Sequence, residues 1–398
     1  MAKDEFIFNE KVKEEKLNIK DSEINNRYLK GEIRIVTEQA RYPLNTISSM
    51  LESGKYDLNP EYQRRKRWNG IQKSRLIESF IINVPIPPIF LYEVDYANYE
   101  VMDGLQRVTT IDDFYNNKFC LEGLEEWKEL NGKTYEELPS RVKEGIDRRY
   151  LSSVVLLNET AKSKDTADYL KQLVFGRLNS GGDKLEPQET RNALYGGKLN
   201  DLCLKLSLNN KFRSLWSLPL IKIQNEKIQN EKELLESEQY RKMQDVELVL
   251  RFFAFRELEH LSKFSSQEMF LDEYLRQGNK FSAEKLAEME KVFNDTIETI
   301  SEIFGKKAFL MPPGSIKRTK PTKTVYDPLM YAIANKLSDK DKLIAKHKEI
   351  NDSLYKDKSK LKLKKDKNND LFDGKYNSRN NIQQRIDFYT DFFNQIIK

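Results

Sequence analysis

The stretch Tyr99–Asn117 reads YEVMDGLQRVTTIDDFYNN and contains the change of hydrophobic period that decides the fold of the N-terminal region. Tyr99–Met102 is a short apolar and aromatic run, which is typical of a β-strand. From position 105 onward, apolar residues recur at three- and four-residue steps, which indicates one face of a helix. These residues are Leu105, Val108, Ile111, Phe114 and Tyr115. The sequence therefore predicts a strand that passes into a helix at Asp103-Gly104.

This join is a candidate anion site. A helix that begins at a glycine turn directs the free amides of its first turn at one point, and the helix dipole adds partial positive charge there. Gly104 has no Cβ to obstruct a ligand, and Arg107 could contact two phosphate oxygens through its planar guanidinium. The alternative for Asp-Gly is a β-hairpin turn. The helical period of the residues that follow argues against a hairpin.

Composition limits the classes of function. A chain of 398 residues is long enough for two or three domains. Its 68 basic and 63 acidic residues give 68 − 63 = +5, so any nucleic-acid-binding surface must be local. The two cysteines and two histidines, Cys120, Cys203, His260 and His347, lack metal-ligand spacing, so we expect neither a zinc site nor a histidine-dependent nuclease. The absence of long apolar runs predicts a cytoplasmic protein without a membrane partner.

A basic run with flanking aromatic residues precedes the second predicted helix. The stretch Tyr56–Trp68 reads YDLNPEYQRRKRW, with its charges at Arg64, Arg65, Lys66 and Arg67. Such a run could hold phosphates while Tyr62 and Trp68 stack on a base. The alternative is a solvated basic face whose two aromatic residues belong to the core. Arg65, Lys66 and Arg67 are thus candidate contacts to nucleic acid.

Hydrophobic patterns predict the remaining elements. We expect a charged arm over residues 1–34 and a strand at Leu151–Leu157, which is the most apolar run of the chain. A strand at Ile89–Glu93 is expected to form a hairpin with Tyr99–Met102. The first half of the chain is predicted to contain a helix within Ile35–Gly54 that stops at Gly54, helices at Gly70–Asn83 and Lys164–Asn179, and one that begins at Pro187 and ends before Gly196.

The second half of the chain is predicted to be a bundle of charged helices, with a helix at Arg241–Leu258. Ile221–Glu233 contains the duplicated unit KIQNEKIQNEK and is expected to be an extended or mobile insertion. Two basic segments, Lys317–Lys323 and Lys356–Lys367, are either solvated surface or contacts to a polyanion. Lys320 and Lys323 are the candidate DNA contacts in the first of these segments.

Three ordered motifs resemble a known family. Asn59–Arg64 is similar to a P-x-Y-Q-R box, and Asp103–Thr110 is similar to a D-G-Q-Q-R-x-T-T box. Phe175–Gly182 with Glu189–Asn192 is similar to an F-x-R-L-N-x-G-G…E-x-R-N box. Together they resemble the N-terminal domain of GmrSD-type, modification-dependent restriction endonucleases, a domain related to ParB and sulfiredoxin.

The resemblance implies an α+β fold, with a small ParB-like mixed α/β domain over residues 35–200 and a mostly helical domain over residues 201–398. It also implies binding and hydrolysis of a nucleoside triphosphate in bacterial defence against foreign DNA. Carried over by position, the catalytic residues would be Asp103, Gln106 and Arg107. Asp103 could hold Mg²⁺ or orient Arg107. The nucleotide-binding residues would be Gln63, Arg64, Gly104, Thr109, Arg177 and Asn179.

The sequence departs from the family in two respects. Leu105 replaces a glutamine of the second box, and the chain has no residues for the histidine nuclease of larger members. We therefore expect a nucleotide hydrolase that acts as sensor or regulator, with DNA and a separate nuclease or other defence protein as partners. The alternatives are a non-catalytic DNA-binding or adaptor module, and a ParB-like domain that itself nicks DNA.

Overall fold

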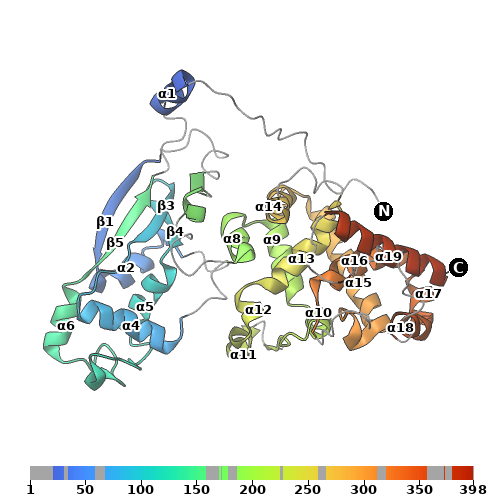
Figure 1. Cartoon of the computed structure of the whole chain (residues 1–398). Helices are drawn as coiled ribbons and strands as arrows, with labels where there is room; N and C mark the ends of the chain where they lie inside the picture. Colours follow the sequence, from blue (N-terminus) through green and yellow to red (C-terminus); the bar gives the residue numbers. More distant parts are fainter. Residues whose placement is uncertain are drawn as a thin grey trace. The chain divides into compact units, whose positions relative to one another are not determined.

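The computed structural model of the chain contains two compact units: a sheet unit, Glu15–Leu185, and a helical unit that contains Glu186–Lys398 (Figure 1). The structure describes residues 21–30, 35–58, 68–157, 170–171, 173–177, 186–224, 227–258, 266–311, 320–355, 372 and 379–397. The basic run at 63–67, the loop at 178–185 and the lysine-rich segment at 356–367 lie outside these ranges.

A five-stranded mixed sheet is the frame of the sheet unit, with the strand order β1-β5-β3-β4-β2. The strands are β1 (Thr37–Pro43), β2 (Tyr56–Asp57), β3 (Ile89–Asp95), β4 (Asn98–Asp103) and β5 (Tyr150–Leu156). β1 pairs with β5 and β3 with β4 in antiparallel fashion, whereas β3 pairs with β5 and β2 with β4 in parallel. This sheet and the helical remainder confirm the predicted α+β class, and the β3–β4 hairpin is as predicted.

Helices of the sheet unit share one apolar core with the strands. They are α1 (Asp21–Lys30), α2 (Ile47–Glu52), α4 (Gly70–Ile81), α5 (Leu105–Tyr115) and α6 (Ser140–Asp147), with 3₁₀ turns η1 (Leu44–Thr46) and η2 (Lys128–Leu130). Residues 170–171 and 173–177 are also helical. The core joins β3 and β4 to α4 and α5 through Ile89, Leu91, Val101, Phe80, Val108 and Ile111. Side chains alternate along a strand, so Glu100, which follows Tyr99 and precedes Val101, is on the opposite face, where Lys171 pairs with it at 2.5 Å.

The join between β4 and α5 depends on Gly104. This buried residue has φ +94°, in the left-handed region that favours glycine. A Cβ at this position would lie 2.3 Å from Cγ2 of Ile89 on β3. Both the backbone conformation and the close approach of β3 therefore require glycine where the strand turns into the helix.

The segment Ile35–Gly54 contains the predicted helix as α2, preceded by the turn η1, but its first part forms the strand β1, which was not predicted. β1 pairs with β5 over its whole length, from Thr37 opposite Leu156 to Pro43 opposite Tyr150. Long-range pairing overrides the local pattern here, and Pro43 is tolerated because β1 is an edge strand.

The helical unit consists of many short and medium helices around α13 (Figure 1). They are α8 (Pro187–Leu194), α9 (Lys198–Ser207), α10 (Asn210–Leu215), α11 (Glu231–Glu236), α12 (Glu238–Arg241), α13 (Gln244–Phe255), α14 (Gln267–Gly278), α15 (Ala283–Phe304), α16 (Lys323–Ala334), α17 (Lys340–Ala345), α18 (His347–Tyr355) and α19 (Arg379–Ile397), with turns η5 (Gly305–Lys307) and η6 (Leu337–Asp339). α13 packs against α8, α9, α14 and α16. Among the described residues, no helix is long and apolar enough to cross a lipid bilayer.

Two segments of this unit differ in detail from their predictions. The predicted helix Arg241–Leu258 is interrupted at Met243, whose φ of +53° separates α12 from α13 and whose side chain is buried in the core. The duplicated segment Ile221–Glu233 forms a short hairpin, β6 (Ile223–Gln224) with β7 (Lys227–Ile228), before α11. A small apolar cluster of Ile221, Leu234 and Tyr240 packs beside it.

The role of Gly104 leads to a stability prediction. Gly104→Ala should lower the free energy of unfolding of the sheet unit by about 2–4 kcal/mol, because left-handed strain and the clash with Ile89 act together. Gly132→Ala is the matched control, since Gly132 has φ +83° and nothing within 4 Å of the added Cβ. It should cost only about 1 kcal/mol. Equal losses in urea denaturation would show that contact with Ile89 is unimportant.

Candidate functional site

The candidate anion site lies where β4 meets α5. Gly104 occupies the N-cap position of α5, and no N-cap side chain bonds to the amides of the first turn. Asp103 is the last residue of β4, and its side chain is 43% exposed. The strand and helix thus place an accessible carboxylate beside a helix N-terminus, as the sequence predicts.

Arg107 is buried by its own contacts. Its side chain is only 13% exposed, and its Nη2 donates to Oδ2 of Asp103 at 2.5 Å. Its Nη1 donates to the carbonyl oxygens of Pro87 and, at 3.1 Å, of Pro88, just before β3. The guanidinium therefore connects three segments and orients the Asp103 carboxylate. The other oxygen of that carboxylate, Oδ1, has no hydrogen-bond partner among the described residues.

Gln106 and Thr109 have different positions on α5. Oε1 of Gln106 accepts the backbone N–H of Trp68 at 3.0 Å, which holds the start of α4 against the first turn of α5. Oγ1 of Thr109 donates to the carbonyl of Leu105 at 2.9 Å and so bonds to its own helix. Of these two residues, Gln106 thus contacts the chain immediately after the basic run.

Several predicted site residues lie outside the described ranges: Gln63, Arg64, Arg65, Lys66, Arg67 and Asn179. Arg177 is exposed at the end of the helical residues 173–177. In the helical unit, Lys320 is exposed, whereas Nζ of Lys323 pairs with Glu247 at 2.7 Å.

The second part of the third box belongs to α8 of the helical unit. Glu189 completes a capping box by accepting the backbone N–H of Glu186 at 2.9 Å. Arg191 is 1% exposed and donates to Asp272 at 2.6 Å, and it also lies 3.4 Å from Glu247. Asn192 accepts a hydrogen bond from Asn200 at 2.7 Å. These residues of the box are therefore held by buried polar contacts within the helical unit.

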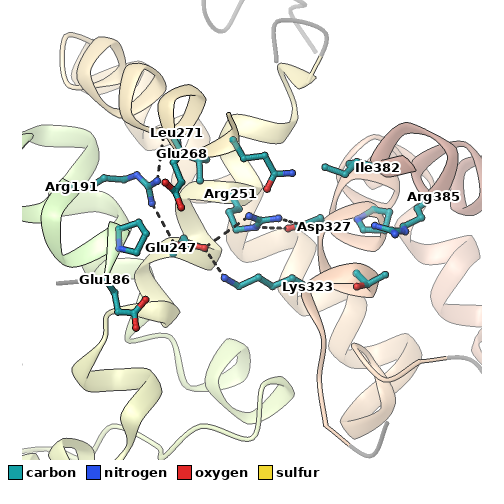
Figure 2. A pocket seen from close by; sticks show the side chains of 14 residues that line it. Glu186, Arg191, Glu247, Arg251, Glu268, Leu271, Lys323, Asp327, Ile382 and Arg385 are labelled. Atoms are coloured by element: carbon teal, nitrogen blue, oxygen red, sulfur yellow. Dashed lines mark hydrogen bonds and ion pairs between the residues drawn. The ribbon is translucent and has the colours of Figure 1, made fainter. Parts of the chain in front are cut away.

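A charged cavity of about 330 Å³ lies beside Arg191 in the helical unit (Figure 2). Sequence reasoning missed most of its lining, which includes Glu247, Arg251, Asp327 and Arg385. The sequence feature that could have indicated these residues is a charged side chain within an apolar helical run, such as Arg251 between Leu250 and Phe252. A charge at a core position needs a partner, and Arg251 makes a two-point ion pair with Asp327.

The cavity charges perturb one another. Burial alone would raise the pKa of Glu247, but attraction to Lys323, Arg251 and Arg191 lowers it below its ordinary value. Burial would lower the pKa of Arg251, yet the pairing with Asp327 raises it. Both groups are therefore held in their charged forms.

No arrangement of three or more histidine, cysteine, aspartate or glutamate side chains suited to a metal ion occurs within the described part of the chain. A single carboxylate with a free oxygen, as at Asp103, is compatible with Mg²⁺, which commonly takes one or two protein carboxylates together with substrate phosphates.

Comparison with known proteins gives one match. Residues 47–196 match the family described as GmrSD restriction endonuclease, N-terminal domain. No curated protein and no solved structure matches the chain. The matched range includes the β4–α5 join of the sheet unit and continues through α8 of the helical unit. The match over residues 47–196 confirms the resemblance to this family that the three sequence motifs indicate.

Proposed function

We propose that the chain binds a nucleoside triphosphate at the β4–α5 join and hydrolyses it as the sensor or regulator of a restriction-type defence system. The observation that carries the proposal is the pairing of an accessible carboxylate, Asp103, with the first turn of α5, where Gly104 provides no capping side chain. The family match at residues 47–196 supports it.

The chemistry of phosphoryl transfer suits this arrangement, because it requires charge neutralisation and a positioned water more than a covalent nucleophile. Asp103 would hold Mg²⁺ through Oδ1, the oxygen that Arg107 does not use. Mg²⁺ would supply neutralisation of phosphate charge. The first-turn amides of α5 would contact phosphate oxygens.

Arg107 has a positioning role in this proposal. Its side chain is committed to Asp103 and to the carbonyls of Pro87 and Pro88, so it fixes the carboxylate and the adjacent loop. Gln106 is similarly placed to hold the beginning of α4 close to the site. Gln63 and Arg64 from the first box, with Arg177 and Asn179 from the third, would complete the nucleotide contacts.

The burial of Leu105 supports a site whose polar groups are unchanged by this departure from the family box. Its side chain is buried in the core that also contains Val101 and Val108. The side chain at position 105 therefore points into the apolar core. It is not part of the exposed polar surface around Asp103. The departure from the family box at this position leaves Asp103, Gln106 and Arg107 in place.

The description of the family as a restriction endonuclease supports DNA as a partner of the chain. The basic run at Arg65, Lys66 and Arg67 ends immediately before Trp68, which bonds to Gln106. We propose that this run contacts DNA, and that a separate nuclease or other defence protein acts with the chain.

Asp103→Asn should weaken Mg²⁺-dependent nucleotide binding and slow phosphate release by about 10- to 150-fold, as expected for loss of one charge-assisted contact. Calorimetric titration and phosphate-release assays with ATP, GTP, CTP and UTP, with and without DNA, measure both quantities. Asp95→Asn is the matched control, because Asp95 is an exposed carboxylate at the far end of the β3–β4 hairpin. Equal behaviour of the two variants would contradict the assignment.

Leu105→Gln restores the usual family residue and tests whether position 105 serves the site. We expect no gain in nucleotide affinity or turnover and a loss of about 1–3 kcal/mol in unfolding free energy, because the amide would be buried in the core. Leu105→Met should cost less than about 1.5 kcal/mol, since it conserves volume and polarity. A rise in phosphate release in Leu105→Gln would show that the side chain at 105 reaches the site.

A further inference from the structure

Three helices begin at the charged cavity of the helical unit. Its lining includes Glu186 and Pro187 at the start of α8, Gln267 and Glu268 at the start of α14, and Lys323 and Thr324 at the start of α16. Each helix N-terminus contributes partial positive charge equivalent to about half a unit. Their convergence on one cavity makes the enclosed space favourable for an anion.

Acidic residues of the lining offset the partial positive charge at only two of these three helix N-termini. Glu186 is at the N-cap of α8, where it also pairs with Lys242 at 2.9 Å, and Glu268 is in the first turn of α14. The first turn of α16 contains no acidic residue and begins with Lys323. A lysine at a helix N-terminus is electrostatically unfavourable, so the positive end of α16 is reinforced.

Buried cations add to this charge. Arg251 and Arg385 are 8% and 3% exposed and line the cavity from α13 and α19, while Lys323 extends from α16 toward Glu247 (Figure 2). The carboxylates of the same lining are the buried Asp327, the partly buried Glu247 and, at two of the helix starts, Glu186 and Glu268. Burial lowers the pKa of Arg385, whereas attraction to Asp327 acts in the opposite direction.

Donors remain available toward the cavity. Nη1 of Arg251 lies 4.0 Å from Oε1 of Glu247 and makes no hydrogen bond among the described residues. Nζ of Lys323 donates to the same oxygen at 2.7 Å, and its other two N–H groups have no hydrogen-bond partner among the described residues. Arg191 differs, because it pairs with Asp272 and also bonds to Gln188.

We propose that this cavity binds the phosphate group of a small phosphorylated ligand, with Lys323 and Arg251 as direct donors and the first turn of α16 as a third source of positive potential. A volume of about 330 Å³ is within the range of small-molecule sites, roughly 300–1,000 Å³. Glu247 would compete with such a ligand, because its carboxylate pairs with Lys323 and lies close to Arg251.

Calorimetric titration of the full-length protein tests this site with inorganic phosphate, pyrophosphate, AMP and, as a non-phosphate anion, succinate. An Asp103→Asn background separates the cavity from the site on α5. Lys323→Gln should weaken binding of the preferred phosphate compound by at least about tenfold. Lys323→Arg should stay within about threefold of the parent, because the charge is retained.

Two further variants sharpen the result. Lys340→Gln is the matched control, since Lys340 also begins a helix, α17, is exposed and does not line the cavity. It should bind like the parent. Glu247→Gln should bind the phosphate compound more tightly, because removing the competing carboxylate frees Lys323; a purely structural network predicts no such gain.

The titrations distinguish binding of phosphate or pyrophosphate from binding of a nucleotide. Phosphate or pyrophosphate binding that is lost in Lys323→Gln supports a phosphate subsite, and tighter binding of AMP identifies a nucleotide as its source. The proposal is overturned if none of the three phosphate compounds binds at millimolar concentration, if succinate alone binds, or if folded Lys323→Gln and Lys340→Gln bind equally.

Discussion

The buried guanidinium of Arg107 is the interaction on which the geometry of the sheet-unit site depends. It ties the end of β4 to the first turn of α5 through Asp103 and to the loop before β3 through the carbonyls of Pro87 and Pro88. Gly104 makes this possible, because only a residue without Cβ allows β3 to approach the join so closely. The result is an oriented carboxylate at an uncapped helix N-terminus, built from residues that are adjacent in sequence.

This local origin explains what could be predicted from the sequence. The change from an apolar and aromatic run to a helical period at Asp103-Gly104 correctly indicates the β4–α5 join, and the hairpin of β4 with β3 was also predicted. The position of β1 was not predictable in this way, because it depends on pairing with β5, more than a hundred residues later. The orientation of Arg107 depends on carbonyls before β3, and no motif specifies that contact.

The charged cavity shows a second reason why part of the structure could not be predicted from the sequence. Arg251, Asp327 and Arg385 belong to three helices that are distant in sequence, and each lies within a segment whose apolar pattern predicts only a packed helix. Pro328, inside α16, also conceals that this helix begins five residues earlier, at Lys323. Packing alone brings these charges together, so the cavity becomes visible only in the folded unit. Part of the family motif, Arg191, belongs to the same network.

The most direct measurement of the central claim is a structure of the protein with a non-hydrolysable nucleoside triphosphate and Mg²⁺. The proposed function predicts phosphate oxygens within hydrogen-bond distance of the first-turn amides of α5 and Mg²⁺ on the Asp103 carboxylate. A nucleotide bound elsewhere, with the start of α5 and Asp103 left without ligand, would contradict it.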